Sequence, residues 1–83
     1  MSAKIIPIGN TIRRATDLGN AVRIARKRQD LTQAELAAKA DVGLRFLSEL
    51  ENGKPTVQLQ RTMRVLAALG LTLGVYDQQV RMK

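Results

Sequence analysis

The side chains that could do chemistry in this sequence are almost all charged, and they exclude several reaction classes. Histidine and cysteine are both absent, which excludes zinc sites, thiolate chemistry and triads that depend on a histidine base. Fourteen Lys and Arg residues stand against seven Asp and Glu residues, giving a net charge of +7. We therefore expect an intracellular protein without a cofactor, whose basic surface attracts phosphate groups or anionic lipid.

Duplex DNA is the partner that this composition favours. Phe46 and Tyr76 are the two aromatic residues, whereas recognition of single strands by stacking needs several exposed rings. No apolar run approaches the roughly 20 residues of a membrane span, and residues 1–8 lack a signal-peptide stretch, so we expect a cytoplasmic protein. A basic membrane-surface protein would need a long helix with a bulky apolar face, which the pattern does not provide.

The residues after Gln33 have the spacing of a DNA-binding helix-turn-helix. With Gln33 counted as the first residue, Ala37 is the fifth, Asp41 the ninth, Leu47 the fifteenth and Leu50 the eighteenth. The motif needs a small residue where its helices approach, a left-handed residue in its turn and apolar residues that dock its second helix. Asp41 replaces the usual glycine but tolerates that conformation. The alternative is an ordinary helical hairpin with incidental spacing.

Four helices are predicted to position these residues, at about 18–29, 33–40, 44–51 and 59–69. Asp17 is the expected N-cap of the first helix, and the segment 32–35 (TQAE) is a capping box for the second. Asn52-Gly53 ends the third helix. The fourth helix is expected to bury one side, formed by Leu59, Met63, Leu66 and Leu69.

The segments that flank the helical domain, predicted at 17–70, have other patterns. Residues 1–16 are expected to be a basic arm with a short apolar stretch at 5–8. Residues 71–83 are expected to form a strand at 71–76 and a short tail, because Leu71, Leu73 and Val75 alternate with less apolar residues as far as Tyr76. Such a strand needs a partner, either the arm or the same strand of a second subunit. We expect the second, which makes these three residues the dimer contact.

Two stretches resemble a known family. The segment 31–37 (LTQAELA), followed by Val42 and by 50–54 (LENGK), resembles the XRE/phage-repressor helix-turn-helix family over about residues 18–71. The ending at 63–76 (MRVLAALGLTLGVY) is similar to HipB-like antitoxins. The resemblance implies an all-α, four-helix, lambda-repressor-like fold with a C-terminal strand that pairs across a homodimer.

The same resemblance implies which residues bind DNA. Gln33 matches a phosphate-binding glutamine, in agreement with the affinity of helix N-termini for phosphate. Positions that face the major groove match Leu44, Arg45, Ser48 and Glu49, and phosphate-contacting positions match Asn52 and Lys54. Arg45 is suited to a bidentate contact with guanine. For Glu49, a solvated or Arg-paired role explains the residue as well as base reading does.

The family also has an ion pair whose positions match Arg26 and Glu51, joining the first helix to the end of the third. A plain basic face that includes Lys27 and Arg28 is the competing interpretation of Arg26.

The resemblance implies a repressor that binds an inverted-repeat operator. If the likeness to HipB holds, the protein represses its own operon and neutralises a HipA-like kinase toxin; the alternative is a standalone regulator without a toxin. An enzyme is disfavoured because the capping box accounts for Glu35 and the pair with Arg26 accounts for Glu51.

Overall fold

The computed structural model describes residues 11–75 and 77 of the chain. The predicted apolar stretch at 5–8 and Tyr76, the last residue of the predicted strand, lie outside the described residues. In the part described, four helices follow one another: α1 (Ala15–Arg28), α2 (Gln33–Ala40), α3 (Leu44–Glu51) and α4 (Leu59–Ala68). None of these helices is long and apolar enough to cross a membrane.

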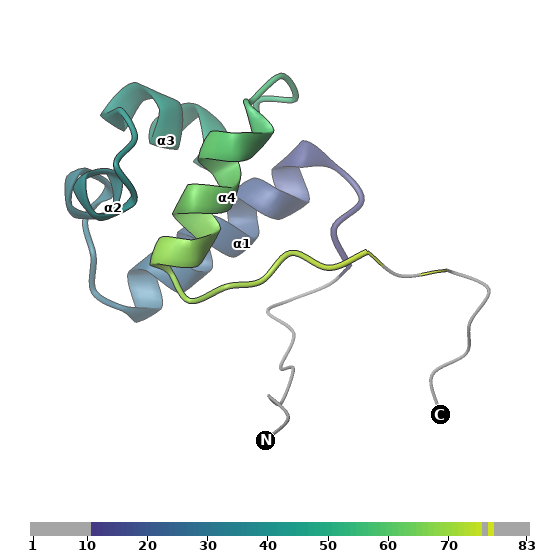
Figure 1. Cartoon of the computed structure of the whole chain (residues 1–83), viewed down its shortest axis with the longest axis horizontal. Helices are drawn as coiled ribbons and strands as arrows, with labels where there is room; N and C mark the ends of the chain where they lie inside the picture. The colour runs from purple at the N-terminus through teal and green to yellow at the C-terminus, as the bar shows by residue number, and fades with distance from the viewer. Residues whose placement is uncertain (1–10, 76, 78–83) are drawn as a thin grey trace.

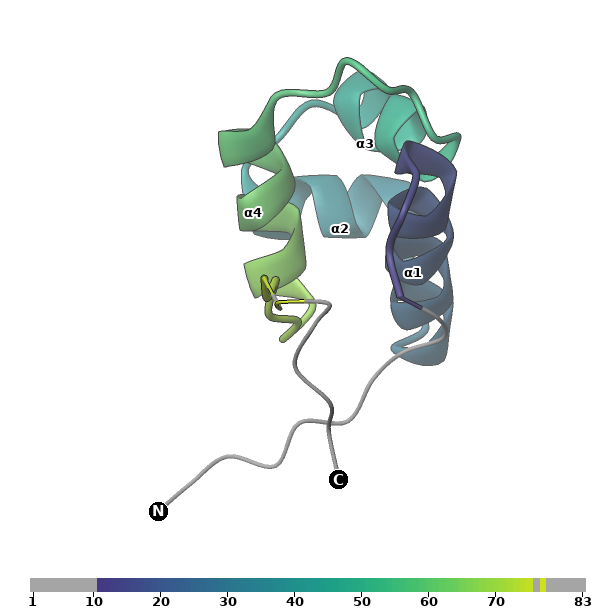
Figure 2. The same ribbon diagram turned by 90° about the vertical axis from the view of Figure 1, so that its right-hand side faces the viewer.

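The four helices form a compact bundle around a small apolar core. Helix α1 packs against α3, and α2 packs against both α3 and α4. Figure 2 shows α1 and α4 on opposite sides with α2 crossing between them and α3 above. Each helix contributes fully buried side chains to the core, the largest of them Leu36, Leu47, Leu50, Val22 and Val65.

The second and third helices begin and end where local chemistry predicts. Thr32 Oγ1 accepts the backbone N–H of Glu35 at 3.0 Å, and the Glu35 carboxylate accepts that of Thr32 at 2.8 Å. These two bonds satisfy amides that the first turn of any helix leaves unpaired. Asp41 ends α2 in the left-handed conformation (φ 56°, ψ 50°), so the prediction for the turn is confirmed. Gly53, with φ 80°, follows α3.

The prediction for the start of the first helix is wrong. Helix α1 begins at Ala15, with Arg14 in the N-cap position, and Asp17 is the third residue of the helix. Its carboxylate Oδ2 accepts the backbone N–H groups of Arg13 and Arg14, both at 3.0 Å. These bonds lower the pKa of Asp17. Asp17 therefore stabilises the start of α1 from inside its first turn, by accepting the amides of the two residues that precede the helix.

The prediction for the buried side of the fourth helix is half wrong. Leu66 and Leu69 are buried, but Leu59 and Met63 are 60% and 45% exposed, and Thr62 and Val65 are buried instead. Thr62 is tolerated in the interior because its hydroxyl donates to the Gln58 carbonyl oxygen at 2.9 Å. The helix thus keeps two large apolar side chains on its outer surface.

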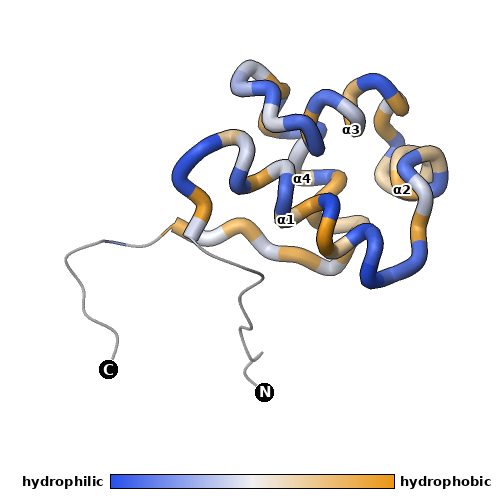
Figure 3. Tube along the Cα trace, turned by 180° about the vertical axis from the view of Figure 1, so that it is seen from behind, coloured by the Kyte–Doolittle hydropathy of each residue, from blue (hydrophilic) through white to orange (hydrophobic). Residues whose placement is uncertain are grey.

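Residues 71–75 leave α4 and run beneath the bundle toward the start of α1 (Figure 1). In this single chain these residues form no strand. Figure 3 shows the segment as a run of apolar and weakly polar residues. Leu71 packs against the core, whereas Leu73 is 44% and Val75 96% exposed. Pairing with a second subunit stays a prediction, since it concerns two chains.

Candidate nucleic-acid interface

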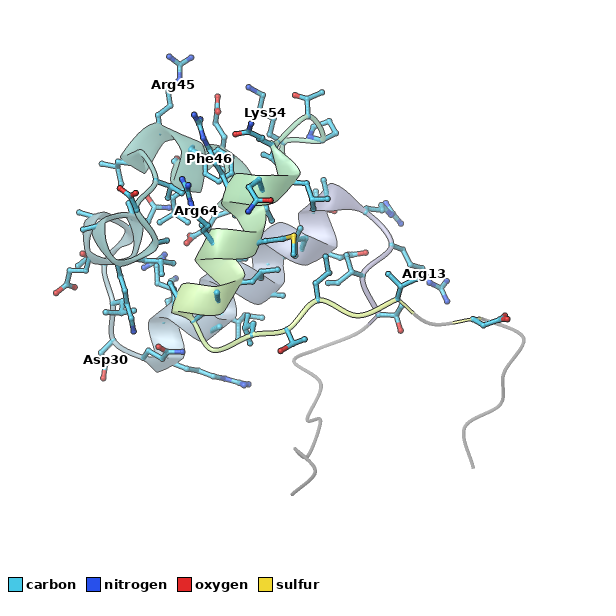
Figure 4. All side chains as sticks on the ribbon, viewed as in Figure 1. Arg13, Asp30, Arg45, Phe46, Lys54 and Arg64 are labelled. Atoms are coloured by element: carbon cyan, nitrogen blue, oxygen red, sulfur yellow. The ribbon has the colours of Figure 1, made fainter. Side chains whose placement is uncertain are left out.

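Helix α3 buries one face and presents the other to solvent. Leu47, Leu50 and Glu51 are buried, which docks the helix on α1 and α2. The positions 44, 45, 48 and 49 lie on the remaining face. Leu44 is half exposed, the side chain of Arg45 is 92% exposed, and Figure 4 shows Arg45 projecting away from the bundle.

The N-terminus of α2 is joined to the end of α3 by a side-chain hydrogen bond. The Gln33 amide Nε2 donates to Glu51 Oε1 at 3.1 Å. Gln33 is the first residue of α2, where backbone N–H groups and the helix dipole favour a bound anion. The bond to Glu51 fixes this side chain at the helix terminus. Sequence reasoning did not predict it, because the partners are eighteen positions apart in the chain and the family resemblance paired Glu51 only with Arg26.

A buried ion pair holds α1 against the same point of α3. Arg26 donates from Nε to Glu51 Oε2 at 2.7 Å and from Nη2 to Glu51 Oε1 at 3.0 Å. Its Nη1 donates to the Leu31 carbonyl oxygen at 2.8 Å. The bond to Glu51 raises the pKa of Arg26, although burial opposes this shift. Arg26 is therefore distinct from Lys27 and Arg28, which are exposed.

This network links α1, α2 and α3 at the Glu51 carboxylate. The Glu51 side chain is 2% exposed and that of Arg26 is 11% exposed, so the carboxylate is shielded from water and the guanidinium is largely shielded. One carboxylate accepts hydrogen bonds from α1 and from the first residue of α2, while Arg26 also holds the loop that precedes α2. A shift of α3 would break all three bonds to the Glu51 carboxylate, and a shift of α2 would break the bond from Gln33.

The turn after α3 places a lysine beside the outward face of that helix. Asn52 is exposed at the C-cap of α3, and the left-handed Gly53 lets the chain reverse. A Cβ at Gly53 would also meet the backbone of Thr16 at 2.9 Å. The backbone N–H of Lys54 donates to the Glu49 carbonyl oxygen at 3.0 Å. Lys54 Nζ then donates to Glu49 Oε2 at 3.2 Å.

Glu49 contacts two cations on this surface. Besides Lys54, it lies 3.7 Å from Arg45 Nε, across one turn of α3. The spacing of Arg45 and Glu49 is typical of a helical ion pair. This contact agrees with the Arg-paired role of Glu49, the alternative to base reading. The contact with Lys54 was not predicted, because it depends on the reversal of the chain at Gly53.

The residues expected at the interface therefore lie on three consecutive pieces of structure, namely the N-terminus of α2, the outward face of α3 and the turn after α3. They are Gln33, Leu44, Arg45, Ser48, Glu49, Asn52 and Lys54. Figure 4 shows Arg45 and Lys54 at one end of the molecule, away from the segment that leaves α4. The residues expected at the dimer contact, Leu71, Leu73 and Val75, belong to that segment and form a separate surface.

Comparison with known proteins identifies this arrangement. A helix-turn-helix family model (HTH_3) matches residues 22–76. The chain is 48% identical over 64 residues, 77% of its length and 84% of the relative's, to the uncharacterized HTH-type transcriptional regulator y4mF of Sinorhizobium fredii. It is 39% identical over 57 residues, 68% of its length and 77% of the relative's, to the control protein C.MunI of a Mycoplasma species.

Solved structures of HipB complexes also match the fold of this chain. A HipB–O4 20mer complex contains a chain that matches with a TM-score of 0.77 and 28% identity, covering 86% of this chain and 100% of that one. A HipA–HipB–O2–O3 complex matches with the same values. The family match covers more than half of the chain and includes α2, α3 and the turn between them. The chain therefore belongs to the XRE-type helix-turn-helix family of DNA-binding transcriptional regulators.

Proposed function

We propose that the protein is a transcriptional repressor that binds duplex operator DNA with α3 in the major groove. One observation carries this proposal: the exposed face of α3, the N-terminus of α2 and the Lys54 side chain lie close together on the molecule. The major groove of B-DNA is wide enough to admit an α-helix such as α3. Phosphates on either side of the groove would then meet the helix N-terminus and the lysine.

In this proposal the contacts divide into those that read bases and those that position the protein. Arg45 binds guanine through its guanidinium, and Leu44 contacts a thymine methyl group. Ser48 and Glu49 reach base edges one turn further along α3. The phosphate contacts come from the remaining three residues, Gln33, Asn52 and Lys54.

The buried network supports this division of roles. Gln33 is held at the start of α2 by Glu51, which Arg26 also holds. A phosphate contact that depends on a fixed side chain gains affinity because less conformational freedom is lost on binding. Arg26 and Glu51 act on DNA only indirectly, by keeping α2 and α3 in register.

We further propose that residues 71–75 pair with the same segment of a second copy. Leu73 and Val75 are exposed apolar side chains in the described chain, and an unpaired apolar segment favours association. A dyad would present two α3 helices to successive major grooves, about 34–36 Å apart. The operator is then an inverted repeat.

The similarity to HipB supports a role as the antitoxin of a HipBA-like pair, which autoregulates its operon and neutralises a kinase toxin. One of the matching structures is a complex of HipA, HipB and the O2 and O3 DNA segments. The second candidate is a standalone XRE-type regulator. The relatives of higher identity are named as an HTH-type transcriptional regulator and a control protein, and both names agree with a DNA-binding regulator.

The DNA-binding part is tested by selecting bound duplexes from a random pool and measuring their affinity against salt concentration. We expect the selected sequence to be an inverted repeat. The affinity of the protein for it should fall by ~10³–10⁵ between about 50 and 200 mM salt, as the neutralisation of six to ten phosphates requires. A flat salt response, or no enriched sequence, would refute the interface. Coexpression with the product of the adjacent open reading frame separates the two candidates: a kinase-like partner that copurifies supports the antitoxin, and its absence supports the standalone regulator.

A further inference from the structure

Glu49 is the acidic side chain of α3 that reaches solvent, because Glu51, the other one, is buried and bonded to Arg26. Glu49 lies between two cations, with its Oε2 atom 3.2 Å from Lys54 Nζ and 3.7 Å from Arg45 Nε. The backbone bond from Lys54 N–H to the Glu49 carbonyl oxygen, 3.0 Å long, keeps the lysine beside the carboxylate. Glu49 thus neutralises part of the basic surface.

We propose that Glu49 is a specificity-determining residue, which weakens binding to unrelated duplexes and favours sites that offer a cytosine amino group. The inference rests on the proposed function, since Arg45 and Lys54 are the cations assigned there to a guanine and a phosphate. It adds a role for the carboxylate that holds both of them in the free protein.

On an unrelated duplex the carboxylate opposes binding in two ways. Phosphate oxygens must compete with Glu49 for Lys54, and the carboxylate itself is repelled by the phosphates as the surfaces approach. The Glu49 side chain is 33% exposed, and its backbone is held on a helix that is docked by Leu47 and Leu50, so the carboxylate stays near the approaching phosphates. Glu49 therefore lowers the affinity for unrelated duplexes, where it gains no new hydrogen bond.

On a matching site the carboxylate regains a partner. The N4 amino group of cytosine is a hydrogen-bond donor in the major groove, and Glu is a side chain suited to accept from it. Arg45 and Glu49 lie one turn apart, about 6 Å along the helix axis. They therefore reach neighbouring base pairs, and a guanine for Arg45 with a nearby cytosine for Glu49 satisfies both charges.

The test compares Glu49→Gln with the wild type on the selected operator and on a scrambled duplex. Asp30→Asn is the control, because it also removes one negative charge and asparagine accepts the left-handed φ of 56° at this position. Figure 4 shows Asp30 at the opposite end of the molecule from Arg45 and Lys54. Circular dichroism checks that both variants keep their helices, and a second selection with Glu49→Gln reads base preference.

We expect Glu49→Gln to bind the scrambled duplex about threefold to tenfold more tightly than Asp30→Asn does, the range set by two exposed ion contacts. Its selected sites should lose a cytosine preference that the wild type shows at one position per half-site, or replace it with adenine, which glutamine reads. Equal affinities of the two variants for the scrambled duplex, or an unchanged base preference, would overturn the proposal. If the wild type itself enriches no sequence, the proposed function fails instead.

Discussion

Replacing Glu51 with alanine tests whether the hydrogen bonds from Arg26 and Gln33 to its carboxylate stabilise the packing of α1 and α2 on α3. The carboxylate accepts three side-chain hydrogen bonds, at 2.7 and 3.0 Å from Arg26 and at 3.1 Å from Gln33. In Glu51→Ala all three are lost, and the Arg26 guanidinium keeps only its bond to the Leu31 carbonyl oxygen. A nearly buried cation then remains without a counter-charge.

The expected loss follows from how deeply the pair is buried. Removing one partner of a fully buried pair costs about 3–5 kcal/mol. Because the Arg26 side chain is 11% exposed, water can reach part of it, and we expect the lower end, about 3 kcal/mol. A domain of this size is stable by roughly 4–12 kcal/mol. At about 4–8 °C per kcal/mol, the Tm should fall by roughly 12–24 °C.

Thermal and urea unfolding followed by circular dichroism measure this change. Glu49→Ala is the matched control, since it removes a carboxylate from the same helix, but one that is partly exposed and paired with the exposed side chains of Arg45 and Lys54. It should change stability by less than about 1 kcal/mol. The double variant Arg26→Met with Glu51→Leu should recover most of the loss, because it leaves no buried charge. An unchanged Tm of Glu51→Ala would mean that the pair is solvated and would refute the reasoning.

Three further predictions concern DNA, assembly and pH. Arg45→Ala should cost roughly 1–3 kcal/mol at one base pair per half-site, whereas Lys54→Ala should weaken all duplexes about equally; operator and scrambled duplexes compared by fluorescence anisotropy would reveal the reverse pattern. Leu73→Pro should convert dimers to monomers that keep helical circular dichroism, since proline removes a ladder donor, and tight dimers in sedimentation equilibrium would contradict this. The Thr32 backbone bond lowers the pKa of Glu35 below its ordinary 4.5. The stabilisation by Glu35 is therefore complete above about pH 4.5 and lost as the pH falls through the lower folded-state pKa. The difference in Tm between wild type and Glu35→Ala should narrow in acid, and a constant difference would refute the capping role.

The parts that sequence predicted well are those fixed by near neighbours. The bounds of α2 and α3 follow from the capping box at 32–35, from the left-handed Asp41 and from Gly53. Each of these signals acts over a few positions, so the residues that cause the structure are adjacent in the chain. The family, too, is read from this continuous motif. The outward positions on α3 were assigned from the family resemblance, because Leu44, Arg45, Ser48 and Glu49 match the family positions that face the major groove.

What the tertiary structure decided involves partners distant in sequence. Helix α4 has apolar residues on more than one side. The sequence pattern therefore could not show that Thr62 and Val65 face the core while Leu59 and Met63 face solvent. The close crossing of α1 and α3 could not be predicted from the sequence either. It requires glycine at position 19, because a Cβ there would lie only 2.8 Å from the Glu51 carbonyl oxygen.

The same division holds at the candidate interface. Sequence supplied the residue types that can bind phosphates and bases, since their chemistry does not depend on the fold. The tertiary structure decided that Gln33 is held by Glu51 and that Glu49 lies between Arg45 and Lys54. The physical reason is that a hydrogen bond or ion pair depends on distances of about 3 Å, which only the packing of whole helices and the reversal at Gly53 can set.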